Sequence, residues 1–133
     1  MEVYTMETLK KRLSCIGYET KKEDENSLSF CLEKVRSTIR NETNLPNIPA
    51  GLEHIAIDMA AGEFLLAKKT FAPDDLSALD LTAAVKEIKE GDTTIAFDTG
   101  EGSLTPEQRL TAYINHLLTY GKEEFSAFRR IRW

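Results

Sequence analysis

The most constraining feature of this chain is an apolar stretch that follows a proline-punctuated turn, TNLPNIPAGLEHIAIDMAAGEFLLAKK over residues 43–69. Its apolar side chains recur at helical spacing on more than one face, and four polar residues interrupt them, which excludes a membrane span. A helix that is apolar nearly all round is buried on several sides. The stretch therefore predicts a central core helix over about residues 49–68. Pro49 is expected to be its first residue, where a missing N–H costs nothing.

Two amphipathic helices are predicted before this core helix. The first covers residues 6–16 and stops at Gly17, a residue suited to a helix C-terminus. The second is expected to begin at a capping box formed by Thr20 and Glu23 and to end near residues 41–43.

The last helix has a clear start and stop. Thr105 and Gln108 form a capping box around a first-position proline, and Gly121 is the expected C-terminal stop. Across the four helices, the apolar stripes predict the core residues Leu28, Leu32, Val35, Ile39, Leu52, Ile55, Met59, Leu66, Leu110, Ile114 and Leu117.

A β-hairpin is predicted before the last helix, over residues 85–97. An isolated hairpin is marginal in water, so we expect it to pack on the helices or on another subunit. Its expected inter-subunit residues are Ile88, Gly91, Asp92, Thr93, Thr94, Ile95 and Phe97. The predicted fold class is thus mainly α: a single domain over residues 1–133, with a small bundle of about four helices in residues 1–121 and a tail at 122–133.

Charge and cysteine content limit the function. A net charge of −5 argues against a protein that mainly grips nucleic-acid phosphates. Cys15 and Cys31 have no metal-site spacing, and both are expected to be buried free thiols on apolar helix faces. Together with an N-terminus that lacks a signal-peptide pattern, they predict a cytoplasmic protein without a membrane segment.

Few residues suggest chemistry. His54 and Asp58 are four apart and share a helix face, a spacing that metal sites use, and Glu63 follows them. No further ligand has a convincing spacing, and no phosphate-binding or dinucleotide motif is present. We therefore expect no enzyme activity, no catalytic residue, no metal and no other cofactor. A metal-assisted enzyme that uses these three side chains is kept as a minor hypothesis.

The C-terminal residues, ending in FRRIRW, form the strongest signal outside the core. Residues 122–133 carry four basic and two acidic side chains in a chain that is acidic as a whole. Arginines interleaved with aromatic residues are typical of interfaces. In the alternative interpretation, the two phenylalanines pack on the last helix and the arginines are solvated. The expected partner-binding residues are Phe125, Phe128, Arg129, Arg130, Ile131, Arg132 and Trp133.

Three stretches taken in order carry a family resemblance: STIRNETNLPNIPAGLEHIAIDMAAGEFL, VKEIKEGDTTIAF and the terminal FRRIRW. Together they resemble the small head–tail connector (adaptor) proteins of tailed bacteriophages and Gram-positive prophages. The resemblance implies a helical bundle that forms a homo-oligomeric ring under the portal protein. Such a ring joins the DNA-filled capsid to the tail and extends the DNA channel without binding DNA specifically.

The resemblance also implies partners and a location. The portal protein would contact the C-terminal tail, and a further head-completion or tail protein would bind the other side of the ring. The protein would act in the host cytoplasm during assembly and in the virion neck afterwards. The isolated subunit is expected to be either a monomer or a ring.

The main alternative is a small helical nucleic-acid-binding or regulatory protein of a mobile element. A helix-turn-helix motif can be tested on residues 28–69. The second helix of that motif is too apolar at its start to present several base-contacting side chains, which makes this alternative the weaker one.

Overall fold

The computed structural model describes residues 4–77, 79 and 105–125 of the chain. This part is mainly helical and has no strand, which confirms the predicted fold class, while the predicted hairpin lies outside the described residues. The α-helices are α1 (Met6–Ser14), α2 (Glu25–Thr43), α3 (Glu53–Phe71) and α5 (Pro106–Thr119). Short 3-10 turns occupy Lys22–Asp24, Ala50–Leu52, Pro73–Leu76 and Lys122–Glu124.

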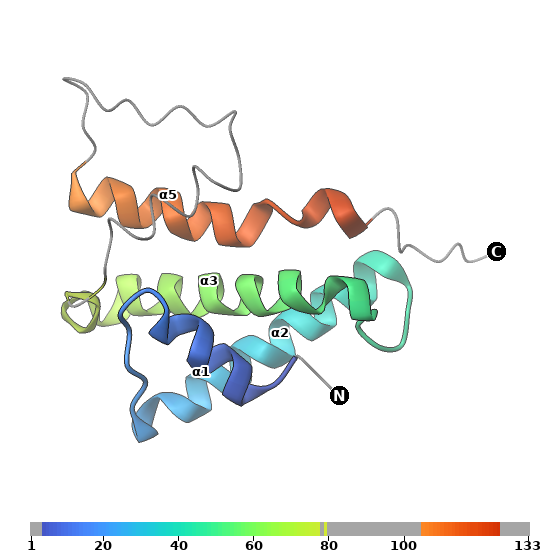
Figure 1. The fold of residues 1–133 in the computed structure, drawn as a ribbon, viewed down its shortest axis with the longest axis horizontal. Coiled ribbons are helices and arrows are strands. Elements are labelled where there is room, and N and C mark those ends of the chain that lie inside the picture. Colours follow the sequence, from blue (N-terminus) through green and yellow to red (C-terminus); the bar gives the residue numbers. More distant parts are fainter. Residues whose placement is uncertain (1–3, 78, 80–104, 126–133) are drawn as a thin grey trace.

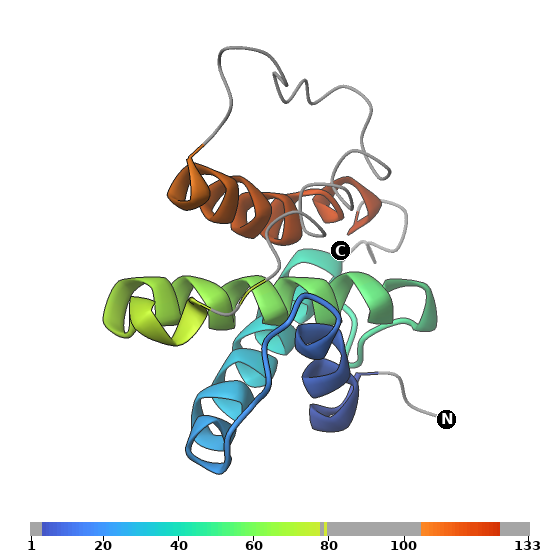
Figure 2. The same cartoon turned by 60° about the vertical axis from the view of Figure 1, so that its left-hand side comes forward.

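Helix α3 is the centre of the arrangement. It lies between α5 on one side and the pair α1 and α2 on the other (Figure 1). The view turned by 60° shows the same order of layers (Figure 2). Among the described helices, α1, α2 and α5 all pack on α3. The sequence prediction of a central helix buried on several sides is therefore confirmed.

Local hydrogen bonds explain where several helices begin and end. The Thr5 hydroxyl accepts from the Thr8 backbone N–H at 3.2 Å, which caps the start of α1. At the start of α5, Thr105 and Gln108 satisfy each other's backbone N–H groups, so the predicted capping box is confirmed. Helix α2 ends at Thr43 and is capped by Asn44, whose left-handed backbone (φ 58°) suits asparagine.

Two predicted helix starts differ from the structure. The predicted Thr20 and Glu23 box is replaced by Asp24, whose carboxylate accepts from the Lys21 backbone N–H at 3.0 Å. Pro49 precedes a 3-10 turn instead of starting α3 directly, and its ψ of 147° is extended. At the first of these places, Asp24 also contacts Tyr18 and Lys68, partners that local spacing does not reveal.

Most of the predicted core is buried, with one correction. Among the predicted core residues, Leu66 is 41% exposed and lies outside the core cluster. It lines a groove of about 560 Å³ with Leu79 and Leu110, because the apolar surface of α3 is larger than the area its described neighbours cover. Eight predicted residues are buried and two, Ile55 and Leu110, are partly buried against the cluster; the eight are Leu28, Leu32, Val35, Ile39, Leu52, Met59, Ile114 and Leu117.

The prediction of two buried thiols was correct for one cysteine only. Cys31 is buried on α2, and burial raises the pKa of its thiol to about 11. Cys15 is exposed, because α1 ends at Ser14 and Cys15 is its C-terminal cap. Helical periodicity extended past that end placed Cys15 on the buried face by mistake.

A buried ion cluster joins the start of α2 to the end of α3. Asp24 is 2% exposed, and it accepts hydrogen bonds from Tyr18 at 2.8 Å and from the Lys21 N–H. Lys68 Nζ lies 2.9 Å from both Asp24 and Asp75. Burial alone would raise the pKa of Asp24, but the hydrogen bonds from Lys68, Lys21 and Tyr18 outweigh it and hold that pKa below its ordinary value of 3.8.

Met59→Asp should abolish cooperative folding, because Met59 is 5% exposed and an unpaired buried charge costs several kcal/mol. The matched control is Leu66→Asp, the same change on the exposed part of the same helix. We expect the control to cost less than about 1 kcal/mol. Urea denaturation followed by circular dichroism measures both. Equal losses of stability in the two variants would contradict the finding that Met59 is in the core and Leu66 is exposed.

Lys68→Met should destabilise the protein by about 3 kcal/mol at neutral pH, because it leaves the Asp24 carboxylate buried without its cation. The folded-state pKa of Asp24 is lowered, so its stabilising contribution is present above pH 3.8 and is lost as the pH falls further. The difference between wild type and variant should therefore shrink at about pH 3. Urea midpoints at the two pH values test this.

The control for that experiment is Lys34→Met. Lys34 pairs with Glu63 at 2.9 Å, but its side chain is 53% exposed, so the loss should be at most about 1 kcal/mol. A Lys68 variant that behaves like this control would show that the Asp24 cluster contributes no more than a surface pair.

Candidate functional site

Three helices meet at Asp58, in the middle of the apolar helix α3. Its Oδ1 lies 2.6 Å from Nε of Arg12 on α1, and both side chains are less than one-fifth exposed. The Tyr120 hydroxyl, at the C-terminal cap of α5, donates to the other carboxylate oxygen. The two oxygens of one carboxylate are thus divided between α1 and α5.

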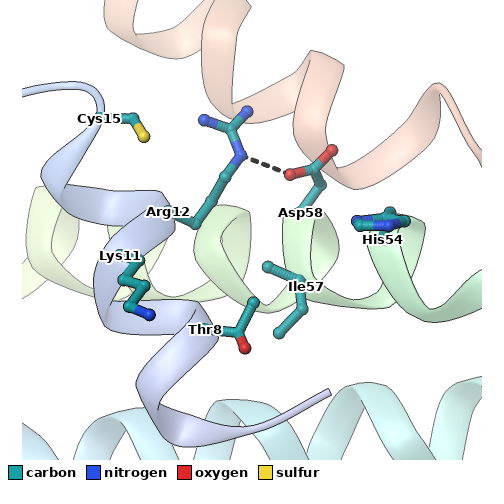
Figure 3. Close-up of a pocket in the computed structure, with 7 residues that line it drawn as sticks. All are labelled: Thr8, Lys11, Arg12, Cys15, His54, Ile57 and Asp58. Carbon is teal, nitrogen blue, oxygen red and sulfur yellow. Dashed lines mark hydrogen bonds and ion pairs between the residues drawn. The ribbon is translucent and has the colours of Figure 1, made fainter. Parts of the chain in front are cut away.

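A shallow pocket of about 350 Å³ lies beside this junction, between α1 and α3 (Figure 3). Figure 3 shows the Arg12 guanidinium directed at Asp58, with His54 one turn earlier on α3. The pocket is lined by Thr8, Lys11, Arg12, Cys15, His54, Ile57 and Asp58. It combines cationic groups with one carboxylate, and that carboxylate is already paired.

The possible metal ligands do not gather. Asp58 pairs with Arg12, and Glu63 pairs with Lys34 on α2 at 2.9 Å. In the part of the chain that the structure describes, no group of three or more His, Cys, Asp or Glu side chains is placed to hold a metal ion. His54, Asp58 and Glu63 are therefore not assembled as the metal hypothesis requires.

The C-terminal tail begins at a fixed point on the bundle. Phe125 is 5% exposed and belongs to the core cluster, a few residues after Gly121, which packs on Ile55 near the start of α3. Its burial corrects the prediction that Phe125 is a partner-binding residue and matches the alternative in which it packs on the bundle. The other predicted tail residues, from Phe128 to Trp133, lie outside the described residues, as do all the predicted hairpin residues.

Gly121 determines how closely this end of the chain approaches α3. A Cβ atom on Gly121 would lie 2.3 Å from Cγ2 of Ile55. The backbone angle φ of Gly121 is −93°, which other residues also adopt, so the constraint is space and not conformation. The sequence identified Gly121 as a helix stop, but its contact with Ile55 could not be read from local spacing.

Large apolar side chains are also exposed on the bundle. Phe30 on α2 is 69% exposed and Phe71 at the end of α3 is 85% exposed. Tyr120 is 41% exposed and stacks on His116 with ring centroids 4.8 Å apart. Sequence analysis did not identify Phe30 and Phe71 as exposed residues. The available signal was that each lies outside the apolar stripe of its helix.

Comparisons with known proteins add no relative. No protein-family model, no curated protein and no solved structure matches the chain. Among the described helices, none is long and apolar enough to cross a bilayer.

Gly121→Ala should destabilise the protein by about 1–3 kcal/mol, because the added methyl group collides with Ile55. The double variant Ile55→Ala/Gly121→Ala should lose less than the sum of the two single changes, since the first change makes room for the second. Denaturation of the four proteins in a double-mutant cycle measures this coupling. Strictly additive losses would contradict the close contact.

Proposed function

We propose that this protein is a head–tail connector of a tailed bacteriophage or prophage, and that it forms a ring under the portal protein. Support comes first from the ordered set of motifs that resembles that family. The mainly helical bundle agrees with the fold that the resemblance implies. The single observation that carries the proposal furthest is the anchored tail: Phe125 is held in the core, and the arginine- and aromatic-rich residues follow it directly.

A ring that closes on itself needs two different complementary surfaces on each subunit. The bundle offers exposed aromatic residues on two different helices, Phe30 and Phe71. These side chains suit contacts between subunits better than a solvated surface, where large aromatics are uncommon. The predicted hairpin is a further candidate for such contacts.

Charge distribution fits the same proposal. The whole chain has a net charge of −5, yet residues 122–133 carry an excess of basic side chains. An acidic channel wall repels phosphates and lets DNA pass without holding it. In this arrangement the tail arginines contact protein carboxylates instead of DNA.

The test is cosedimentation with the assembled portal ring encoded beside this protein. We expect saturable binding by the full chain and loss of binding when residues 126–133 are removed. This truncation removes the arginines and keeps the buried Phe125, and an unchanged unfolding midpoint checks that the bundle stays intact. No binding by the full-length chain would contradict the proposal, and a salt-dependent DNA shift would then favour the nucleic-acid-binding alternative.

A pair of charge reversals refines the result. Arg130→Glu should weaken portal binding while leaving the unfolding midpoint unchanged. Lys22→Glu, at an exposed position in the 3-10 turn before α2, is the matched control and should bind normally. Equal weakening by both would indicate a general charge effect instead of a tail contact.

A further inference from the structure

We propose that the Arg12–Asp58–Tyr120 junction is a latch that couples helix α1 to the base of the C-terminal tail. The observation behind it is the division of one carboxylate between two elements that are far apart in sequence. Arg12 contacts one oxygen and Tyr120 donates to the other. This inference does not depend on which partner the tail binds.

The arrangement of the helices gives Asp58 its importance. Helices α1 and α5 lie on different sides of α3 and each packs on α3 (Figures 1 and 2). Asp58 lies on α3 and reaches both. A change that moves α1 therefore alters the same carboxylate that holds the end of α5.

The α5 side of the latch lies at the base of the tail. Tyr120 is the C-terminal cap of α5 and is followed directly by Gly121, which packs on Ile55 of α3. The Tyr120 ring stacks on His116 at an interplanar angle of 15°, which fixes the direction of its hydroxyl. Phe125 completes the anchored segment. Loss of the Asp58 contact should thus loosen residues 120–125 before the rest of the bundle.

The polar contacts are well suited to this coupling. The Arg12–Asp58 pair is largely shielded from water, so its charges interact more strongly than those of an exposed pair. The Arg12 guanidinium orients the Asp58 carboxylate through one oxygen, and a carboxylate is a strong acceptor for the Tyr120 hydroxyl at the other. Arg12 is therefore a positioning residue: it holds Asp58 in place for the hydrogen bond between Asp58 and Tyr120.

The test is amide hydrogen exchange of the full chain in Arg12→Met and Tyr120→Phe variants. For Arg12→Met we expect exchange about five- to thirty-fold faster in residues 116–125 as well as in α1, with α2 little changed. For Tyr120→Phe we expect the reciprocal effect, faster exchange in α1. An unchanged rate in residues 116–125 of the Arg12 variant would overturn the latch.

A matched control comes from the same helix. Lys10→Met removes the Lys10–Glu25 pair, which joins α1 to α2 at 3.1 Å and does not involve Asp58. It should change exchange near that pair and leave residues 116–125 at the wild-type rate. Equal acceleration in every helix of the Arg12 variant, α2 included, would reveal global destabilisation and would also overturn the proposal.

Discussion

The described fold depends on the burial of α3 on both of its sides. Ala60 and Ala61 let neighbouring helices approach, and Gly62 lies so close to α5 that a Cβ atom there would be 3.0 Å from Leu118. Gly121, just beyond the C-terminus of α5, repeats this close approach against Ile55, nearer the start of α3. Two positions without a side chain therefore set the separation between α3 and the C-terminal end of α5, and packing at this density leaves little tolerance for added volume.

Hydrophobic burial is not directional, so it cannot by itself fix how helices are rotated and shifted on α3. Two acidic residues provide contacts that are directional. Asp24 joins the start of α2 to Lys68 near the end of α3, and Asp58 joins α3 to both α1 and α5. Each of these carboxylates has a cationic partner from another element, which is the condition under which a largely buried charge is tolerated. Helix α3 supplies most of the core, and its few polar contacts select one arrangement of the helices that pack on it.

Sequence analysis predicted the helices and most of the core, because helical periodicity is a local property. It failed where contacts between distant residues decide the outcome. The ring of Tyr120 and the guanidinium of Arg12 reach Asp58 from opposite ends of the chain, and no local spacing indicates such a meeting. Leu66 shows a related limit. Helical periodicity places it on an apolar face but cannot predict whether a neighbouring helix covers it.

The buried position of Phe125 limits where the tail can act. Trp133 can lie no further than about 28 Å from Phe125, because a fully extended chain spans at most about 3.6 Å per residue. In the proposed complex, a partner bound by the tail arginines must therefore lie within that distance of Phe125. The hydrogen bond from Tyr120 to Asp58 holds the end of α5 just before Phe125, so the packing of the bundle also sets where the proposed partner-binding residues begin.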